Sequence, residues 1–254
     1  LSLCDDVRLS VCEGDTISAR TNLHFIPGDE RNLAVRAAKK YFEAIDEPER
    51  GLCIHIHKRI PVGAGMGGGS ADAAAVLRGL NRALDNRLSA ERLEELAAEV
   101  GSDVAFCVRG GTMLAHGRGE LLSELPDMPK CIFVICKPQF SISTPELFRK
   151  LDQVSLRRHP DTAGLISALE QGNLRELCCR MYNVFEDVND RRMRTVAAIK
   201  SVLIDKGALG AVMTGTGSAV FGVFSDKTEA EGAREELKRE HGFCCLAECV
   251  GRLM

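Results

Sequence analysis

Residues 60–75 of this chain read Ile60-Pro61-Val62-Gly63-Ala64-Gly65-Met66-Gly67-Gly68-Gly69-Ser70-Ala71-Asp72-Ala73-Ala74-Ala75. Five glycines fall within seven residues, and an alanine-rich, helix-forming stretch follows at once. Glycine loses more conformational entropy on folding than any other residue, so this density indicates a ligand that needs bare backbone close by. Consecutive N–H groups without side chains surround an anion well, and the helix behind them adds a partial positive charge. The stretch therefore predicts a phosphate-binding loop that opens a helix.

This loop does not fit the two commonest phosphate-binding motifs. A Walker P-loop ends in Gly-Lys-Ser/Thr, whereas these glycines run into Ser70-Ala71-Asp72. Gly63, Gly65 and Gly68 do spell G-x-G-x-x-G, but a Rossmann site needs a strand that ends in an acid about 20 residues on. Residues 88–97 instead have the pattern of a second helix with a serine N-cap. A strand-to-helix turn without a ligand is the remaining alternative, although such a turn needs one or two glycines rather than five.

Composition excludes several classes of protein. The 254 residues carry a net charge of −3 without a basic block, which argues against nucleic-acid binding. No apolar run has membrane-spanning length and no signal peptide opens the chain, so we expect no membrane association and a cytoplasmic location. The eleven cysteines are scattered and form no C-x-x-C pair. We expect them to be reduced, small apolar residues.

Hydrophobic periodicity predicts an α+β chain. The predicted secondary structure becomes mainly helical after Pro138, so we expect an N-terminal lobe over residues 1–130 and a C-terminal lobe over residues 131–254. Alternation predicts strands at residues 7–11, 53–57, 111–116, 131–136, 211–213, 219–224 and 243–250. Helical spacing predicts helices at residues 33–45, from the glycine loop to 84, and at 90–100, 145–151, 165–169, 174–182, 193–205 and 228–240.

Several segments resemble, in chain order, the GHMP kinases. The segment from Pro61 to Ser70 resembles their second motif, usually Pro-x-x-x-Gly-Leu-Gly-(Gly/Ser)-Ser-(Ser/Ala). The segment from Thr214 to Phe221 is similar to their third motif. Further segments that look like family segments are residues 32–38, 101–106, 138–145 and 183–186. The ordered set, which covers nearly the whole chain, is most similar to the branch that acts on cytidine diphosphate-linked methylerythritol in non-mevalonate isoprenoid biosynthesis.

The resemblance implies a fold and an activity. The expected fold has two lobes: an N-terminal lobe like ribosomal protein S5 domain 2 and a ferredoxin-like C-terminal lobe. The expected activity is ATP-dependent, Mg²⁺-assisted phosphorylation of the 2-hydroxyl of the cytidyl substrate, by a monomer or weak homodimer. Two alternatives stay open. One is another GHMP kinase, for homoserine or mevalonate, against which residues 141–148 argue mildly; the other is a nucleotide-binding relative without catalysis.

The resemblance also implies which residues form the nucleotide and metal sites. Ser70 has two interpretations, because its hydroxyl either caps the helix that it starts or touches phosphate or Mg²⁺. The residues expected to bind the nucleotide are Pro61, Val62, Gly63, Ala64, Gly65, Met66, Gly67, Gly68, Gly69, Ser70 and Ala71.

Asp103 is the expected catalytic base, because it occupies the position of the family's catalytic aspartate. Spacing alone favours an N-cap aspartate instead. Gly215 and Gly217 are expected to shape the phosphate and substrate site, although a plain hairpin turn also accounts for two glycines. Thr144 is expected to contact the substrate. Phe148 is expected either to stack on cytosine or to pack in the core.

Other polar residues have plainer interpretations. His55 and His57 share one strand face and are expected to be solvated, since no third metal ligand is evident. Lys58 and Arg59, just before the glycine loop, could either reach nucleotide phosphates or form a surface pair, and we expect the surface pair. The family usually begins with Lys-Ile/Leu-Asn-Leu and Asp-Gly-Tyr-His-x-Leu, which this sequence lacks, so we expect a trimmed chain. Loss of the lysine, which helps to polarise the reacting hydroxyl in the family, is expected to cost on the order of 10²–10³ in rate.

Overall fold

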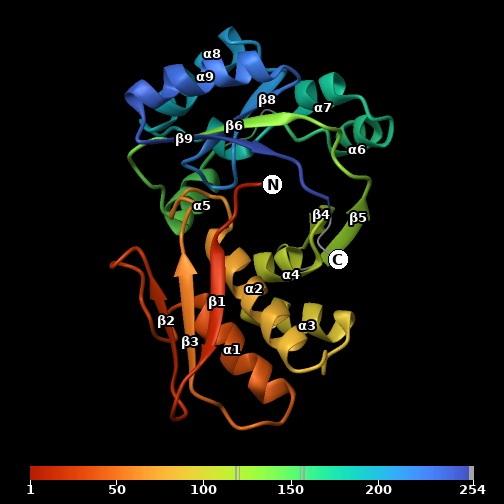
Figure 1. The fold of residues 1–254 in the computed structure, drawn as a ribbon. Helices are drawn as coiled ribbons and strands as arrows, with labels where there is room; N and C mark the ends of the chain where they lie inside the picture. Colours follow the sequence, from red (N-terminus) through yellow and green to blue (C-terminus); the bar gives the residue numbers. More distant parts are fainter. Residues whose placement is uncertain (118, 120, 155, 157, 252–254) are drawn as a thin grey trace. The chain divides into compact units, whose positions relative to one another are not determined.

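A computed structural model describes residues 1–117, 119, 121–154, 156 and 158–251 of the chain. The described residues form two compact units (Figure 1). The first unit consists of Cys4–Ile60 and Gly67–Glu124, and the second of Leu1–Leu3, Pro61–Met66 and Leu125–Gly251. The glycine stretch, Pro61–Ala71, therefore begins in the second unit and ends in the first. The division expected at residues 130 and 131 stays a prediction.

The first unit is built on a three-stranded sheet of order β1–β3–β2. β1 (Asp6–Val11) runs antiparallel to β3 (Leu52–His57), and β2 (Ile17–Thr21) runs parallel to it. α1 (Leu33–Ala44) makes the crossover between the two parallel strands. In β3, Leu52, Ile54 and Ile56 are buried while His55 and His57 are exposed, which confirms the solvated face predicted for the histidines.

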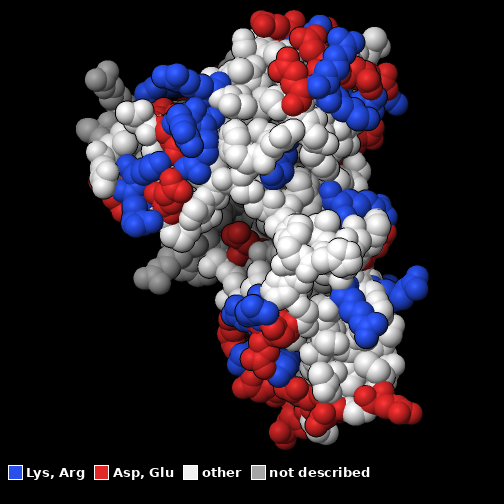
Figure 2. Space-filling model, turned by 90° about the vertical axis from the view of Figure 1, so that its left-hand side faces the viewer, with Lys and Arg blue, Asp and Glu red and all other residues white. Residues whose placement is uncertain are grey.

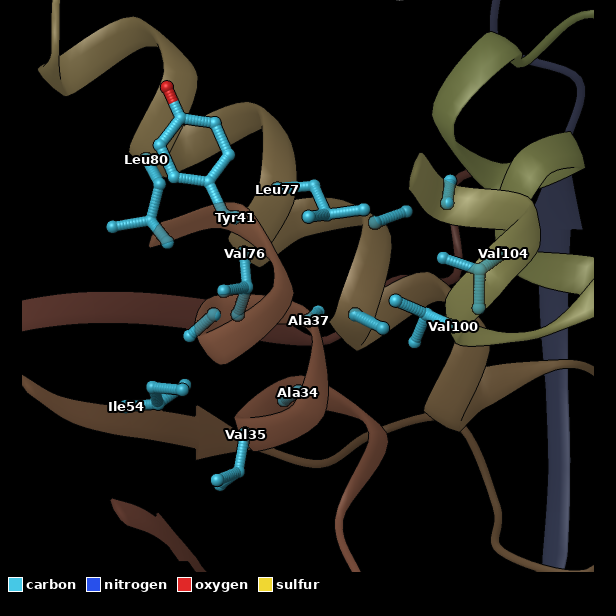
Figure 3. Close-up of a cluster of buried hydrophobic side chains, with 14 of the residues drawn as sticks. Ala34, Val35, Ala37, Tyr41, Ile54, Val76, Leu77, Leu80, Val100 and Val104 are labelled. Carbon is cyan, nitrogen blue, oxygen red and sulfur yellow. The ribbon is translucent and has the colours of Figure 1, made fainter. Parts of the chain in front are cut away.

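Helices cover this sheet and supply most of the first unit's core. They are α1, α2 (Gly68–Ala83), α3 (Ala90–Val100) and α4 (Ser102–Arg109), followed by the hairpin of β4 (Thr112–His116) and β5 (Leu121–Leu125). Ser89 caps α3 by accepting a hydrogen bond from the Arg92 amide, as predicted. Small and branched side chains of α1 and α2 pack around Ile54 (Figure 3). The Tyr41 hydroxyl, fully buried there, donates to Asn81 Oδ1 at 2.9 Å.

The second unit has a four-stranded antiparallel sheet of order β7–β8–β6–β9. Its strands are β6 (Ile132–Lys137), β7 (Gly210–Met213), β8 (Val220–Phe224) and β9 (Phe243–Glu248). Numbered along this unit, the order is second, third, first, fourth, which is the ferredoxin-like arrangement that the resemblance implied. The helices of this unit are α5 (Thr144–Leu151), α6 (Thr162–Glu170), α7 (Leu174–Arg180), the 3₁₀ helix η1 (Val184–Asp187), α8 (Met193–Asp205) and α9 (Lys227–Glu240).

Strand β6 separates two hydrophobic cores in the second unit. Val134 and Cys136 point into the core formed with α8 and α9, which lie together over the sheet (Figure 1). Phe133 and Ile135 point into the core formed with α6 and α7. This alternation is what a strand buried on both faces requires.

The charged surface residues and the cysteines are arranged as the composition led us to expect. On the face drawn in Figure 2, Lys and Arg side chains lie beside Asp and Glu side chains. All eleven cysteines lie in the described ranges and are free thiols. Within the described ranges, no helix has the length and apolarity needed to cross a membrane.

Candidate active site

The end of the glycine stretch forms an open helix N-terminus in the first unit. Gly67 is the N-cap residue of α2, with a left-handed φ of 63°, and no side chain caps the helix. Ser70 is the third residue of α2, so its interpretation as an N-cap is wrong. The first amides of a helix have no intrahelical acceptor, and the first turn here contains no acidic residue. The amides of Gly68, Gly69 and Ser70 are therefore available to an anion.

Asp103 lies in the first turn of α4, also in the first unit. Gly101 is the N-cap residue of that helix, and no side chain caps it, so the N-cap interpretation of Asp103 is wrong. The carboxylate is exposed and accepts no hydrogen bond from the residues that the structure describes. A negative charge in a first turn is favourable. Asp103 is thus placed at a helix terminus with its side chain exposed.

A buried charge cluster lies next to the start of α2. Lys58 donates to Asp72 Oδ2 at 2.6 Å and forms an ion pair with Asp5. The exposed fractions of these side chains are 4% for Lys58, 6% for Asp72 and 3% for Asp5. The expectation of a surface pair is therefore wrong for Lys58. It holds for Arg59, whose exposed guanidinium pairs with Asp6.

The two acids of this cluster differ in their ionisation. Burial raises the pKa of Asp72 above its ordinary value, and this outweighs the hydrogen bond and charge of Lys58, which lower it. The pKa of Asp5 lies below its ordinary value. Burial acts to raise this pKa, but hydrogen bonds from Lys58 and from the Ile60 and Arg59 amides outweigh that effect. Asp5 is therefore the more strongly ionised partner of Lys58.

The first half of the glycine stretch packs against the second glycine turn within the second unit. The Thr214 hydroxyl donates to the Gly65 carbonyl at 3.0 Å, and the Ala219 amide donates to the Ala64 carbonyl at 3.0 Å. A Cβ atom at Gly65 would collide with the Thr214 carbonyl oxygen, so only glycine allows this approach. The structure thus brings Gly65 together with the turn that contains Gly215 and Gly217.

Thr144 and Phe148 lie on α5, near the same turn of the second unit. The Thr144 and Thr216 hydroxyls are 2.8 Å apart. Phe148 is half-exposed, and its ring meets that of Phe185 edge to face with centroids 4.9 Å apart. The ring of Phe148 therefore packs against Phe185 on one side, while about half of its surface is exposed.

Asn183 braces this turn in a way that the sequence did not reveal. Its amide donates to the carbonyls of Met213 and Gly215, both at 2.8 Å. Glu186 accepts from the Met213 amide at 2.7 Å. The segment from Asn183 to Glu186 carries no local signal of these partners, because they lie about 30 residues further along the chain.

The residues present fit a phosphate-bearing ligand better than a metal ion on its own. The uncapped start of α2 suits phosphate oxygens. In the part of the chain that the structure describes, no three His, Cys, Asp or Glu side chains gather as metal ligands. A divalent cation would therefore need ligand oxygens from a nucleotide besides any protein hydroxyl such as that of Ser70.

Comparison with known proteins places the chain in a family. Residues 32–111 match the GHMP kinases N terminal domain, and residues 165–242 match the GHMP kinases C terminal region. The 4-diphosphocytidyl-2-C-methyl-D-erythritol kinase of Syntrophomonas wolfei is 42% identical over 95% of this chain and 84% of its own length. The enzyme of that name from Bacillus subtilis is 41% identical over 96% of this chain and 83% of its own length. The chain belongs to the GHMP kinases.

Solved structures confirm the two-lobed α+β fold of this GHMP kinase. A crystal structure of 4-(cytidine 5'-diphospho)-2C-methyl-D-erythritol kinase superposes with a TM-score of 0.78 at 28% identity, over 97% of this chain and 86% of the other. Homoserine kinase from Cytophaga hutchinsonii has the same TM-score at 20% identity, over 98% and 86% of the two chains, and shows the fold alone. As a GHMP kinase, the protein is an ATP-dependent phosphotransferase.

The candidate residues of this GHMP kinase are distributed unevenly over the matched ranges. The glycine stretch and Asp103 fall within the N-terminal match, and Gly215 and Gly217 within the C-terminal match. Thr144 and Phe148 lie between the two matches. These two candidates therefore belong to the part of the chain that the general family descriptions leave out.

Proposed function

We propose that this GHMP kinase transfers the γ-phosphoryl group of ATP to the 2-hydroxyl of 4-diphosphocytidyl-2-C-methyl-D-erythritol, in non-mevalonate isoprenoid biosynthesis. The observation that carries the kinase chemistry is the uncapped N-terminus of α2, reached through left-handed glycines. The substrate is supported by relatives of that name at 41–42% identity over most of the chain. We propose a cytoplasmic location and a monomer or weak homodimer as part of this function.

Each candidate residue has one task in this proposal. The amides of residues 62–70, those of Gly68, Gly69 and Ser70 foremost, bind and orient the triphosphate. The Ala71 amide, which was expected to take part, donates instead to the Gly67 carbonyl at 2.9 Å. Asp103 accepts the proton of the substrate hydroxyl, or favours its loss electrostatically. Mg²⁺, held by phosphate oxygens and the Ser70 hydroxyl, would neutralise charge on the transferring group. Thr144, Gly215 and Gly217 position the substrate, and Phe148 stacks on its cytosine.

The choice of acceptor is tested by an ADP-release assay with three alcohols. We expect turnover with 4-diphosphocytidyl-2-C-methyl-D-erythritol, and ADP release at the background level with homoserine and mevalonate. Preferred turnover of homoserine or mevalonate would overturn the substrate assignment while keeping the kinase chemistry. ATP binding without turnover of any of the three would contradict the proposed activity.

A further inference from the structure

The buried cluster of Lys58, Asp5 and Asp72 joins three segments that are distant in the sequence. Asp5 precedes β1, Lys58 follows β3, and Asp72 is the fifth residue of α2. A buried ion pair is weak support for stability, because desolvation of the charges offsets their attraction. Asp72 Oδ1 adds to that cost, since it is buried and accepts no hydrogen bond within the described residues. The cluster therefore calls for an explanation other than stability.

Its contacts fix the chain immediately before the glycine stretch. Asp5 Oδ1 accepts from the Arg59 amide at 2.5 Å and from the Ile60 amide at 2.8 Å. Asn22 holds the Lys58 backbone twice: its Oδ1 accepts from the Lys58 amide at 2.7 Å, and its Nδ2 donates to the Lys58 carbonyl at 3.2 Å. Residues 58–60 are therefore held by side chains on both sides.

The ammonium group of Lys58 also fixes the chain immediately after the glycines. Lys58 Nζ bonds Asp72 one turn into α2, and it lies 3.4 Å from the position of a Cβ atom built on Gly68. The lysine thus lies directly against the first turn of the helix.

We propose that Lys58 and Asp72 are positioning residues, which hold the two ends of the glycine stretch so that the first turn of α2 is preformed for the phosphates of ATP. This inference rests on the proposed function. Glycine-rich backbone has many conformations to lose, and fixing its ends removes part of that cost before the ligand arrives. The cluster acts through the backbone and needs no contact with the nucleotide.

Titration of a non-hydrolysable ATP analogue into chain variants tests this inference. Asp72→Ala and Lys58→Met each remove the hydrogen bond between Lys58 and Asp72. We expect each to weaken analogue binding about tenfold, as loss of one charged hydrogen bond does. Asp72→Asn keeps an acceptor for Lys58, and we expect binding within about threefold of the parent chain. Arg59→Met is the matched control, because that neighbouring cation is exposed and lies outside the cluster. We expect it to bind as the parent does.

Kinetics separate positioning from simple loss of folded protein. We expect Asp72→Ala to raise KM for ATP about tenfold and to leave KM for the alcohol within about twofold. A merely structural role would lower the active fraction, and hence kcat, with both KM values unchanged. Folded Asp72→Ala that binds the analogue as tightly as the parent would overturn the inference.

A variant at an exposed position keeps the test decisive if the buried variants fail to fold. Asn22→Ala removes the clamp on the Lys58 backbone, and we expect it to fold and to weaken analogue binding about threefold. Unchanged binding in that case would overturn the inference. A parent chain that does not bind the analogue would instead refute the proposed function.

Discussion

Asp103 carries the most specific claim about a single residue. Asp103→Asn preserves the shape of the side chain but removes its ability to accept a proton. We expect turnover to fall by about 10²–10⁴, the usual range for loss of a positioned base, with ATP affinity unchanged. Steady-state ADP release and analogue titration measure the two quantities.

A second acid provides the control for this prediction. Glu91 lies in the first turn of α3, is exposed and belongs to the same unit. Glu91→Gln therefore changes a comparable helix-terminal charge outside the proposed site, and we expect no change in turnover. Equal losses in Glu91→Gln and Asp103→Asn, or none in either, would remove Asp103 from the mechanism.

Phe148 is the residue that we expect to distinguish the cytidyl end of the substrate. Phe148→Ala removes a half-exposed ring, and loss of stacking of one base costs about 1–3 kcal/mol. We therefore expect KM for the cytidyl substrate to rise at least about fivefold, with KM for ATP unchanged. Phe25, exposed in the first unit, is the control, and Phe25→Ala should change neither value. A rise in KM for ATP alone would place Phe148 near the nucleotide instead.

Asp190 gives a prediction about pH and stability. Hydrogen bonds from Arg192 and Lys150 hold its pKa below the ordinary value, although burial acts in the opposite direction. A carboxyl with a lowered folded-state pKa stabilises the fold above its unfolded pKa, and this stability is lost as pH falls through the folded value. We expect Asp190→Asn to lower the free energy of unfolding by about 2 kcal/mol at pH 7.

Denaturant unfolding of the parent and Asp190→Asn at several pH values measures this effect. The difference between the two proteins should stay constant from pH 7 to about pH 5 and shrink below about pH 4. A difference that grows as the solution is acidified would show that Asp190 is not an ionised partner of Arg192 and Lys150.

At the scale of elements, the left-handed N-cap of α2 explains why a glycine stands there. Gly67 has a φ of 63°, and a Cβ atom added to it would meet nothing within 4 Å. Gly67→Ala is therefore opposed by backbone strain alone, and we expect a loss of about 1–2 kcal/mol in the free energy of unfolding. If the turn relaxes to relieve that strain, ATP affinity falls with it. Thermal unfolding and analogue titration measure both effects.

Gly232, in the interior of α9, is the matched glycine. Its backbone is helical, and a Cβ atom added there also meets nothing within 4 Å. Because alanine is the better helix former, Gly232→Ala should raise the free energy of unfolding by about 0.5–1 kcal/mol without changing ATP affinity. A Gly67→Ala protein as stable as the parent would show that α2 does not need a left-handed N-cap.

Periodicity predicted the longer elements because each has a buried stripe. Four short elements escaped it, of which the four-residue 3₁₀ helix η1 is the shortest. β2 has only Ile17 and Ala19 as buried residues, β5 exposes most of its side chains, and α4 spans only eight residues between glycines. Two turns of helix or one short edge strand contain too few repeats to define a period.

The alternation of buried residues along β3 also indicates that Lys58 is buried, but its charge argued against that prediction. Lys58 continues the inward alternation of Leu52, Ile54 and Ile56, and it is buried as they are. Asp72 lies four residues before Val76, on the inward face of α2. Lys58 was nevertheless predicted to lie on the surface, because isolated lysines are almost never buried. Only the fold shows that Asp5 and Asp72 compensate its charge.

At the scale of the whole molecule, charge alone does not explain binding of a polyanion. The net charge is −3, and the face in Figure 2 mixes acidic with basic side chains. A long-range attraction for ATP is therefore not expected from net charge. Recognition must come from short-range groups, and the uncapped amides of α2 are the group that the sequence and the fold both supply.

The most direct test of this account is a crystal structure of the chain with a non-hydrolysable ATP analogue. We predict that the triphosphate contacts backbone amides within Val62–Ser70, those of Gly68, Gly69 and Ser70 among them. A triphosphate bound elsewhere, with these amides free of ligand, would contradict the central claim.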